Sequence, residues 1–230
     1  MTNRSTLSVG MLLFENATQL DLTSAYEVFA RMPGARVSLL SRTLEPVRTE
    51  WGLTITPDLA LADAPPFEVI CVPGGWGVNA LLTDHALLDF LSVQGESARY
   101  VTSVCTGALL LGAAGLLRGY RATTHWMSLD LLHLFGATPV SERVVRDRNR
   151  ITGAGVTAGI DFALVLAAEL FGETEAERIQ LAIEYDPHPP FDSGSPRTAA
   201  AEVRDAVLRA SELSLAERRA AIELSIRKRT

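Results

Sequence analysis

Short apolar runs alternate along this chain with longer segments of helical spacing. The runs cover residues 7–14, 36–40, 67–72 and 100–104, and several are rich in β-branched side chains. Segments this short and this apolar are typical of strands that are buried on both faces. Because helical patterns fall between several of them, the sequence predicts a parallel sheet covered by helices on both sides.

The helical segments are identified by apolar spacing and by glycines near their ends. They are predicted at residues 22–31, 85–98, 106–114, 128–135 and 157–171. Residues 49–56 are expected to form a bent strand or part of a hairpin. Residues 144–147 and 151–152 are expected to be two strands joined by a tight polar turn.

The chain length fits one large domain with an added C-terminal element. Of the 230 residues, 47% are hydrophobic, which is enough to fill a sizeable core without disulfides. The segment from Tyr185 to Pro196 is too rich in proline for a helix interior, and a charged helical pattern resumes at residues 199–229. We therefore expect a main domain over residues 1–196 and a helical extension over residues 197–230 that packs on the body or on a partner subunit.

Charge and cysteine content limit the partners and the compartment. With 21 basic and 27 acidic residues the formal charge is −6, so nucleic-acid binding is disfavoured. Two cysteines are too few for a disulfide framework and favour a reducing compartment. Met1 to Ser5 carries one arginine but no cleavable apolar region, and no apolar run approaches the roughly 20 residues of a membrane span. These features predict a cytoplasmic protein with no membrane association.

Cys105 has the clearest chemical signal. It stands where the apolar run YVTSV passes directly into a helix of small residues, which places its thiol above the carboxyl ends of the strands. The positive end of that helix favours thiolate, and Gly107 allows the close strand-to-helix approach of a nucleophile elbow. The alternative is that Cys105 is simply a buried apolar residue, which is the usual role of a free cysteine.

The run VICV contains Cys71, which fits that structural role, and leads into the glycine-rich turn PGGWG. Backbone amides at Gly75 and Trp76 can therefore face the same end of the sheet as Cys105. Such amides can stabilise negative charge on an intermediate, although a glycine-rich turn without a catalytic role is equally common. The turn lacks the P-loop lysine and the GxGxxG spacing, so nucleotide binding is disfavoured.

Two further titratable residues fall near predicted element ends. Asp21 lies between the first strand and the first helix, and it is either a helix N-cap or a proton carrier beside Cys105. His125 lies among small polar residues next to Trp126 and is expected in the core or behind the site. The four histidines show no HExxH spacing and the cysteines no CxxC spacing, so no metal site is predicted.

These motifs together resemble the ThiJ/PfpI superfamily of class I glutamine-amidotransferase-like proteins. The resemblance covers nearly the whole chain and is carried by LDL around Asp21, PGG at 73–75, SVCTG around Cys105, ATTHW around His125 and TAGID at 157–161. The chain is most similar to the isocyanide hydratases of that superfamily, also in its proline-rich segment and helical tail. The resemblance implies an α/β fold, a flavodoxin-like sandwich with a mostly parallel central sheet, helices on both faces and a nucleophile elbow. It also implies a homodimer.

The activity that the resemblance implies is hydration of an isocyanide to an N-substituted formamide, with no cofactor and no metal. Cys105 is then the nucleophile that forms a covalent thioimidate, and Asp21 carries the proton. Thr106 orients the thiolate through its hydroxyl or its amide. Protease and glyoxalase-like relatives commonly carry glutamate at the position of Asp21, and several carry histidine at that of Thr106, so both residues favour the hydratase.

The resemblance also leads to expectations about the substrate pocket. The pocket is expected to be lined by Gly75, Trp76 and Val156. The backbone amides of Gly75 and Trp76 are expected to act as hydrogen-bond donors to negative charge. His125 is expected to support the site from behind.

Other functions remain open. One is a glyoxalase-like or amidase-like enzyme that uses the same thiol, and another is a redox sensor, since an exposed thiol of low pKa also oxidises.

Certain transcription regulators share the SVCTG and ATTHW motifs but continue into a helix-turn-helix domain. Only about one helix of sequence follows Pro196 here, so DNA binding is disfavoured.

Overall fold

A seven-stranded sheet forms the centre of the molecule, in the order β10-β11-β7-β6-β1-β2-β5. The computed structural model describes residues 6–229, and the expectation for Met1 to Ser5 lies outside the described residues. The strands are β1 (Leu7–Leu12), β2 (Ala35–Ser41), β5 (Leu59–Ala60), β6 (Val69–Val72), β7 (Tyr100–Val104), β10 (Val144–Asp147) and β11 (Arg150–Gly153).

The sheet is parallel except at one edge. Only β10 runs antiparallel to its neighbour β11, and the two are joined by the polar turn expected from the sequence. Every residue of the central strands β6 and β7 is buried, which is why both read as short apolar runs. With β5 and β10 set aside, the strands lie in the order second, first, third, fourth, fifth, which is the flavodoxin-like arrangement. The predicted fold class is confirmed.

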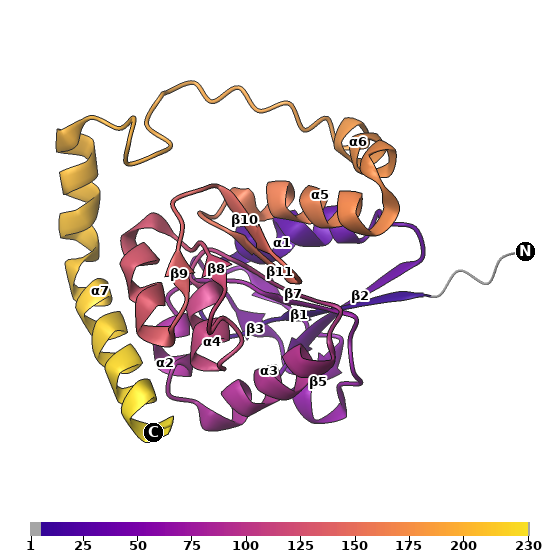
Figure 1. Cartoon of the computed structure of the whole chain (residues 1–230), viewed down its shortest axis with the longest axis horizontal. Coiled ribbons are helices and arrows are strands. Elements are labelled where there is room, and N and C mark those ends of the chain that lie inside the picture. The colour runs from indigo at the N-terminus through magenta and orange to yellow at the C-terminus, as the bar shows by residue number, and fades with distance from the viewer. Residues whose placement is uncertain (1–5, 230) are drawn as a thin grey trace, which may run out of the picture.

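Helices cover both faces of the sheet (Figure 1). On one face lie α1 (Gln19–Phe29), α5 (Ala158–Phe171) and α6 (Glu173–Ala182), and the rings of Phe29 and Phe162 meet edge to face at 5.9 Å. On the other face lie α2 (Val78–Leu81), α3 (His85–Ser97), α4 (Gly107–Ala113) and the 3-10 helix η2 (Trp126–Phe135). The apolar spacing did not reveal α6, because few of its side chains are buried.

The structure decides between the alternatives for one expected element and corrects the helix type of another. The segment expected to be a bent strand or hairpin is a hairpin of β3 (Val47–Arg48) and β4 (Thr54–Ile55). The helix predicted at residues 128–135 is 3-10 rather than α. Its buried residues recur every three or four positions, a spacing that both helix types produce, so the sequence pattern could not separate them. Short strands β8 (Arg121–Ala122) and β9 (Thr138–Pro139) pair beside it.

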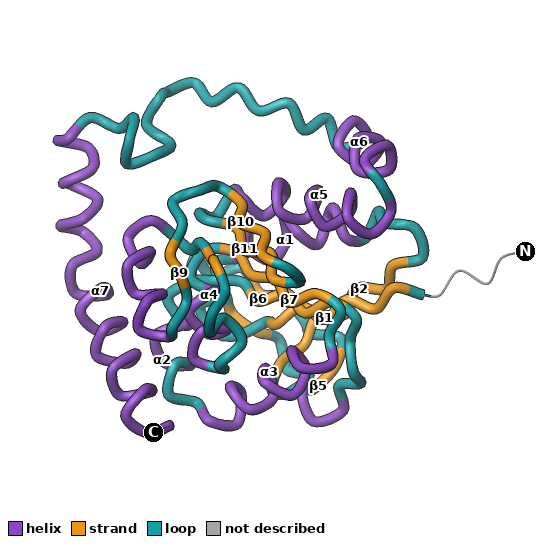
Figure 2. The backbone as a smooth tube through the Cα atoms, in the orientation of Figure 1, coloured by secondary structure: helices purple, strands orange, loops and turns teal. Residues whose placement is uncertain are grey.

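The chain ends in α7 (Ala201–Arg229), which a long loop connects to α6. Figure 2 shows this loop, residues 183–200, crossing outside the main body, and it contains the proline-rich segment expected to be irregular. The last part of α7 packs on the body beside α2, α4 and η2, with Ile222 fully buried. Earlier apolar positions of the helix, Val203, Val207 and Leu213, are exposed.

Candidate active site

Cys105 occupies a sharp backbone turn between β7 and α4. Its φ angle is 56°, in the left-handed region that residues with a side chain rarely adopt. Two hydrogen bonds hold this turn. The Cys105 amide donates to the Gly153 carbonyl oxygen at 3.1 Å, and the Thr124 hydroxyl donates to the Cys105 carbonyl oxygen at 2.7 Å. A strained residue fixed in this way at a strand-to-helix junction is a nucleophile elbow.

Glycine is needed at two positions around the elbow. A Cβ atom at Gly107 would lie 2.1 Å from the Val72 carbonyl oxygen, so the close strand-to-helix approach predicted from this glycine is confirmed. A Cβ atom at Gly74 would lie 2.5 Å from the Thr106 amide nitrogen and 2.8 Å from Asp21 Oδ2. The loop after β6 can therefore approach Thr106 and Asp21 this closely only because residue 74 is a glycine.

Asp21 lies in the first turn of α1 and points into the protein. It is completely buried, and its Oδ2 accepts a hydrogen bond from the Gly74 amide at 2.8 Å. The helix begins at Gln19 with Thr18 at the N-cap, so the N-cap alternative for Asp21 is wrong. Within the described part of the chain, Oδ1 has no hydrogen-bond partner of standard geometry, and the Cys105 thiol lies beside this carboxyl group.

Burial governs the acidity of this pair. Desolvation raises the pKa of Asp21 to about 7, although the Gly74 amide and the Cys105 thiol lower it in part. Desolvation also raises the pKa of the Cys105 thiol well above its ordinary value, and repulsion from the Asp21 carboxylate is the second cause. The expected exposed thiol of low pKa is therefore wrong, because Cys105 is only 5% exposed and the Thr106 amide offsets desolvation only in part. The two acids titrate as a pair.

Cys105 lines a cavity of about 410 Å³ at the carboxyl ends of the central strands. Six of the residues singled out in the sequence lie on its wall: Gly75, Trp76, Cys105, Thr106, His125 and Val156. Asp21 is buried beside the thiol. The carboxyl edge of a parallel sheet is where this fold class places its ligand sites, so the strand ends bring these residues together.

The two amides expected to stabilise negative charge are already hydrogen-bonded within the protein. The Gly75 amide donates to Thr106 Oγ1 at 3.0 Å, and the Trp76 amide donates to Glu50 Oε1 at 2.6 Å. Gly75 and Trp76 line the cavity as expected. Their amides, however, are not free to act as the expected donors, because both already donate within the protein. The Thr106 hydroxyl also donates to the Gly75 carbonyl oxygen at 3.4 Å, so it fixes this loop, while the Thr106 amide lowers the pKa of the thiol.

His125 lies on the cavity wall as a neutral ring. Burial and then the positive charge of Arg218 lower its pKa to about 4. Its ring packs against that of Trp126 at 5.9 Å, and no hydrogen bond joins His125 to Cys105 within residues 6–229. His125 therefore contacts the cavity directly instead of lying behind it as expected.

Trp51, Glu50 and Arg218 are among the cavity residues that were not predicted from the sequence. Trp51 lies between β3 and β4 with its ring 5.2 Å from that of Trp76, and the two residues are 79% and 53% exposed. Glu50 accepts a hydrogen bond from the Thr18 hydroxyl at 2.8 Å as well as from the Trp76 amide. Arg218 comes from α7, and a charged helix gives no cue that one of its arginines turns inward. The only cue for Trp51 was its place beside Gly52 in the expected hairpin.

Arg218 connects α7 to the cavity wall. Its guanidinium is almost fully buried, with Nε donating to Asn79 Oδ1 and Nη1 donating to Ser128 Oγ, each at 2.9 Å. Asn79 also donates through Nδ2 to the Ser214 carbonyl oxygen at 3.2 Å. The C-terminal helix is therefore fastened to the body close to the reactive thiol.

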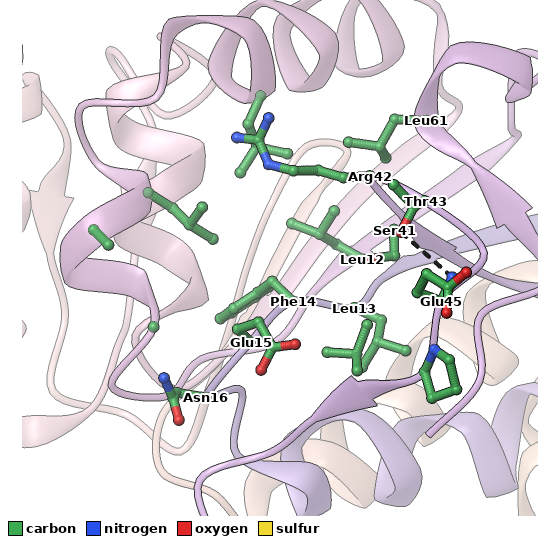
Figure 3. A pocket seen from close by; sticks show the side chains of 16 residues that line it. Leu12, Leu13, Phe14, Glu15, Asn16, Ser41, Arg42, Thr43, Glu45 and Leu61 are labelled. Atoms are coloured by element: carbon green, nitrogen blue, oxygen red, sulfur yellow. Dashed lines mark hydrogen bonds between the residues drawn. The ribbon is translucent and has the colours of Figure 1, made fainter. Parts of the chain in front are cut away.

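A second cavity, of about 360 Å³, lies beside the ends of β1 and β2 (Figure 3). Its lining is mostly apolar, with Leu12, Phe14 and Leu61, and the Arg42 side chain extends over it to an ion pair with Asp84. The described residues that line it include no cysteine and no histidine. We therefore assign the chemistry to the cavity that contains Cys105.

The described residues offer neither a membrane-spanning helix nor a cluster of metal ligands. No helix among the described residues is both long enough and apolar enough to cross a membrane. Over the same residues, no cluster of three or more histidine, cysteine or acidic side chains is arranged to hold a metal ion.

The sequence match to known families agrees with this geometry. The family model of the DJ-1/PfpI family matches residues 7–169, which contain the whole sheet, the elbow and Asp21. The chain belongs to the DJ-1/PfpI family. The superfamily resemblance drawn from the motifs is thereby confirmed.

Relatives of this DJ-1/PfpI protein match it well beyond the family segment. It is 53% identical to the isonitrile hydratase of Pseudomonas putida over 226 residues, which cover 96% of this chain and 99% of that protein. The crystal structure of a ThiJ/PfpI family protein from Pseudomonas syringae matches with a TM-score of 0.92 and 44% identity, covering 95% of this chain and 91% of the other. Both matches therefore reach into α7.

The same family segment occurs in regulators. The chain is 35% identical over 190 residues to the HTH-type transcriptional regulator GbdR of Pseudomonas aeruginosa. That match covers 79% of this chain but only 50% of the regulator.

Proposed function

We propose that this protein hydrates isocyanides to N-substituted formamides, with Cys105 as nucleophile and Asp21 as proton carrier. The observation that carries the proposal is the buried Asp21–Cys105 pair on a nucleophile elbow beside an open cavity. The 53% identity to the isonitrile hydratase of Pseudomonas putida, over nearly the full length of both chains, supports the same substrate class.

The first step adds the thiol across the terminal carbon of the isocyanide. The Asp21 carboxylate takes the thiol proton on Oδ1, the oxygen with no other partner among the described residues. The thiolate then bonds to the carbon, and Asp21 returns the proton to that carbon. The product is a neutral thioimidate, R–N=CH–S–Cys105. The raised pKa of Asp21, about 7, suits both transfers, because a proton carrier works best when its pKa lies near the working pH.

The second step hydrolyses the thioimidate. Asp21 removes a proton from water as the water oxygen attacks the carbon, and the nitrogen takes up that proton. Collapse of the tetrahedral intermediate breaks the C–S bond, releases R–NH–CHO and returns the hydroxyl proton to the sulfur through Asp21. One isocyanide and one water give one formamide, and the thiol and the carboxylate are restored.

The cavity suits a substrate that is mostly hydrocarbon. Leu20, Met127 and Val156 give it apolar walls, and the rings of Trp51 and Trp76 pack together as part of its lining. The isocyano group has no net charge and donates no hydrogen bond, so binding has to come mainly from contact with the organic group of the substrate. We assign Thr106 the role of fixing the Gly75 loop and keeping its amide at the thiol.

We further propose that the protein is a cytoplasmic homodimer that works without cofactor or metal. The exposed apolar residues Val203 and Val207 on α7 support a partner contact at that helix. We retain residues 1–196 as the catalytic domain and residues 197–230 as its helical extension, because the long loop separates α7 from the sheet.

The test is turnover of cyclohexyl isocyanide, followed as N-cyclohexylformamide by chromatography. We expect turnover by the wild-type protein and none by Cys105→Ala. Cys71→Ala is the matched control, because Cys71 is fully buried in β6 and burial raises its pKa to about 12. Rapid quenching and mass spectrometry should find the thioimidate on Cys105, and Asp21→Asn should slow its formation.

Normal turnover by Cys105→Ala would eliminate the covalent mechanism. Faster turnover of methylglyoxal or of an amide than of the isocyanide would favour the glyoxalase-like or amidase-like alternative. Burial of Cys105 and its raised pKa weigh against a redox sensor, since oxidation requires an accessible thiolate.

A further inference from the structure

We propose that Arg218 is the counter-charge of the Asp21–Cys105 pair, and that α7 supplies it to the active site as a positioning residue. The inference deepens the proposed function and rests on the nucleophilic role of Cys105 in it. Arg218 lines the same cavity as the thiol, although it lies near the end of the chain.

The burial of Arg218 needs an explanation. Arg218 is 5% exposed, and both of its hydrogen bonds go to neutral acceptors, Asn79 Oδ1 and Ser128 Oγ. Over residues 6–229, no carboxylate forms an ion pair with it. Burying a guanidinium without an anionic partner is unfavourable, because the charge loses its hydration. A negative charge held elsewhere in the cavity compensates for that penalty.

The charges that face the cavity show where that negative charge lies. The proposed mechanism keeps one negative charge on Asp21 and Cys105 and passes it between oxygen and sulfur. Glu50 is a second anion, but the Thr18 hydroxyl and the Trp76 amide already bind its two oxygens. His125 is neutral above about pH 4, because burial and Arg218 lower its pKa. Arg218 is therefore the only cation among the described residues that line the cavity.

Electrostatic effects in both directions agree with this pairing. The positive charge of Arg218 lowers the pKa of the Cys105 thiol, against the larger effects of desolvation and Asp21. Burial lowers the pKa of Arg218, and attraction to Cys105 and then to Glu50 raises it. The interaction strengthens when sulfur becomes thiolate, so it favours the state that attacks the substrate.

The two neutral acceptors fix the place from which the charge acts. Asn79 follows the glycine-rich loop in α2, and Ser128 lies in η2 close to His125, so the guanidinium is held between two elements of the body. The Asn79 side chain is itself fixed by the Ser214 carbonyl oxygen. Arg218 therefore needs no conformational change to act on the pair.

The test measures the pH dependence of Cys105 alkylation by iodoacetamide, with mass spectrometry of the Cys105 peptide. For Arg218→Gln we expect the midpoint of alkylation to rise by about one pH unit or more. Arg218→Lys keeps the positive charge, so its alkylation midpoint should stay close to that of the wild-type protein. Arg219→Gln is the matched control, because Arg219 is the next residue on α7 and is exposed, and it should leave the midpoint unchanged.

A second variant keeps the test decisive if Arg218→Gln does not fold. Ser128→Ala removes one acceptor and leaves the charge, so the guanidinium loses its fixed position. We expect a smaller shift of the alkylation midpoint in the same direction. An unchanged midpoint in folded Arg218→Gln, or in Ser128→Ala when Arg218→Gln is unfolded, would overturn the proposal.

Turnover of a carboxylate-bearing isocyanide separates this role from substrate binding. If Arg218 only binds an anionic substituent, Arg218→Gln would raise KM for isocyanoacetate and leave the alkylation midpoint unchanged, which also overturns the proposal. The alkylation measurement needs no isocyanide. A shifted midpoint without isocyanide turnover would therefore keep the role of Arg218 and reject the proposed substrate.

Discussion

The Asp21 carboxyl group and the Cys105 thiol lie beside each other in the interior, one from the first turn of α1 and the other from the junction of β7 and α4. Burial disfavours charge on both groups and raises both pKa values, and the Asp21 carboxylate raises that of the Cys105 thiol further. The Asp21 carboxyl group, with a pKa of about 7, can therefore take up and return a proton near neutral pH. This property can be measured in the absence of substrate.

Asp21→Asn should change how stability depends on pH. The pKa of Asp21 is about 7 in the folded protein against 3.8 as its ordinary value. Between these values the folded state keeps a proton that the unfolded state has lost, so the free energy of unfolding falls as pH rises, by up to about 1.4 kcal/mol per pH unit. In Asp21→Asn we expect the free energy of unfolding to show no such decrease with rising pH. Urea unfolding at about pH 5 and about pH 7.5 measures it.

His125 acts in the opposite direction in that experiment, because its pKa is lowered to about 4 and its contribution to stability rises with pH over the same range. Wild type and Asp21→Asn share this contribution, so it cancels in the comparison. Parallel pH profiles for the two proteins would show that Asp21 does not carry a raised pKa.

Gly107→Ala should destabilise the protein strongly. The added Cβ would lie 2.1 Å from the Val72 carbonyl oxygen, so either α4 or the end of β6 has to move. We expect a loss of about 2 kcal/mol or more, seen as a lower Tm. Gly194→Ala is the control, since no atom lies within 4 Å of its added Cβ. Equal Tm values for the two variants would contradict the elbow geometry.

Trp51→Ala should affect large substrates more than small ones. The Trp51 ring is 79% exposed in the free protein and packs on Trp76, so its contribution appears only when an organic group reaches it. We expect KM for cyclohexyl isocyanide to rise about fivefold or more, with kcat little changed. Methyl isocyanide should show no such rise. An equal effect on both substrates would show that Trp51 acts on the protein rather than on the substrate.

Thr106→Val should weaken catalysis by releasing the loop after β6. Valine keeps the shape of threonine but leaves the buried Gly75 amide without its acceptor, which costs about 1–3 kcal/mol. We expect kcat/KM to fall at least about tenfold, because Gly74 in the same loop holds Asp21. Thr106→Ser keeps the hydroxyl and should recover most of the activity. If Thr106→Ser is as impaired as Thr106→Val, the hydroxyl is not the reason.

The sequence predicted the parts of this site that follow strand ends. Cys105 and the Gly75 loop come directly after β7 and β6, and the geometry of a parallel sheet brings such positions to one edge. Arg218 follows no strand, and its inward turn depends on how α7 docks. The direction of the Cys105 pKa shift was also wrong from sequence alone, because it depends on how much of the thiol is buried.

The position of Arg218 in the chain has a consequence for synthesis. A growing polypeptide leaves the ribosome from its N-terminus, so the strands, the elbow and Asp21 can fold while α7 is still inside the exit tunnel. The cavity then lacks the wall that Arg218 forms, and it gains that wall only when the final helix docks on Asn79 and Ser128. A nascent chain therefore carries its cysteine before it carries its complete active site.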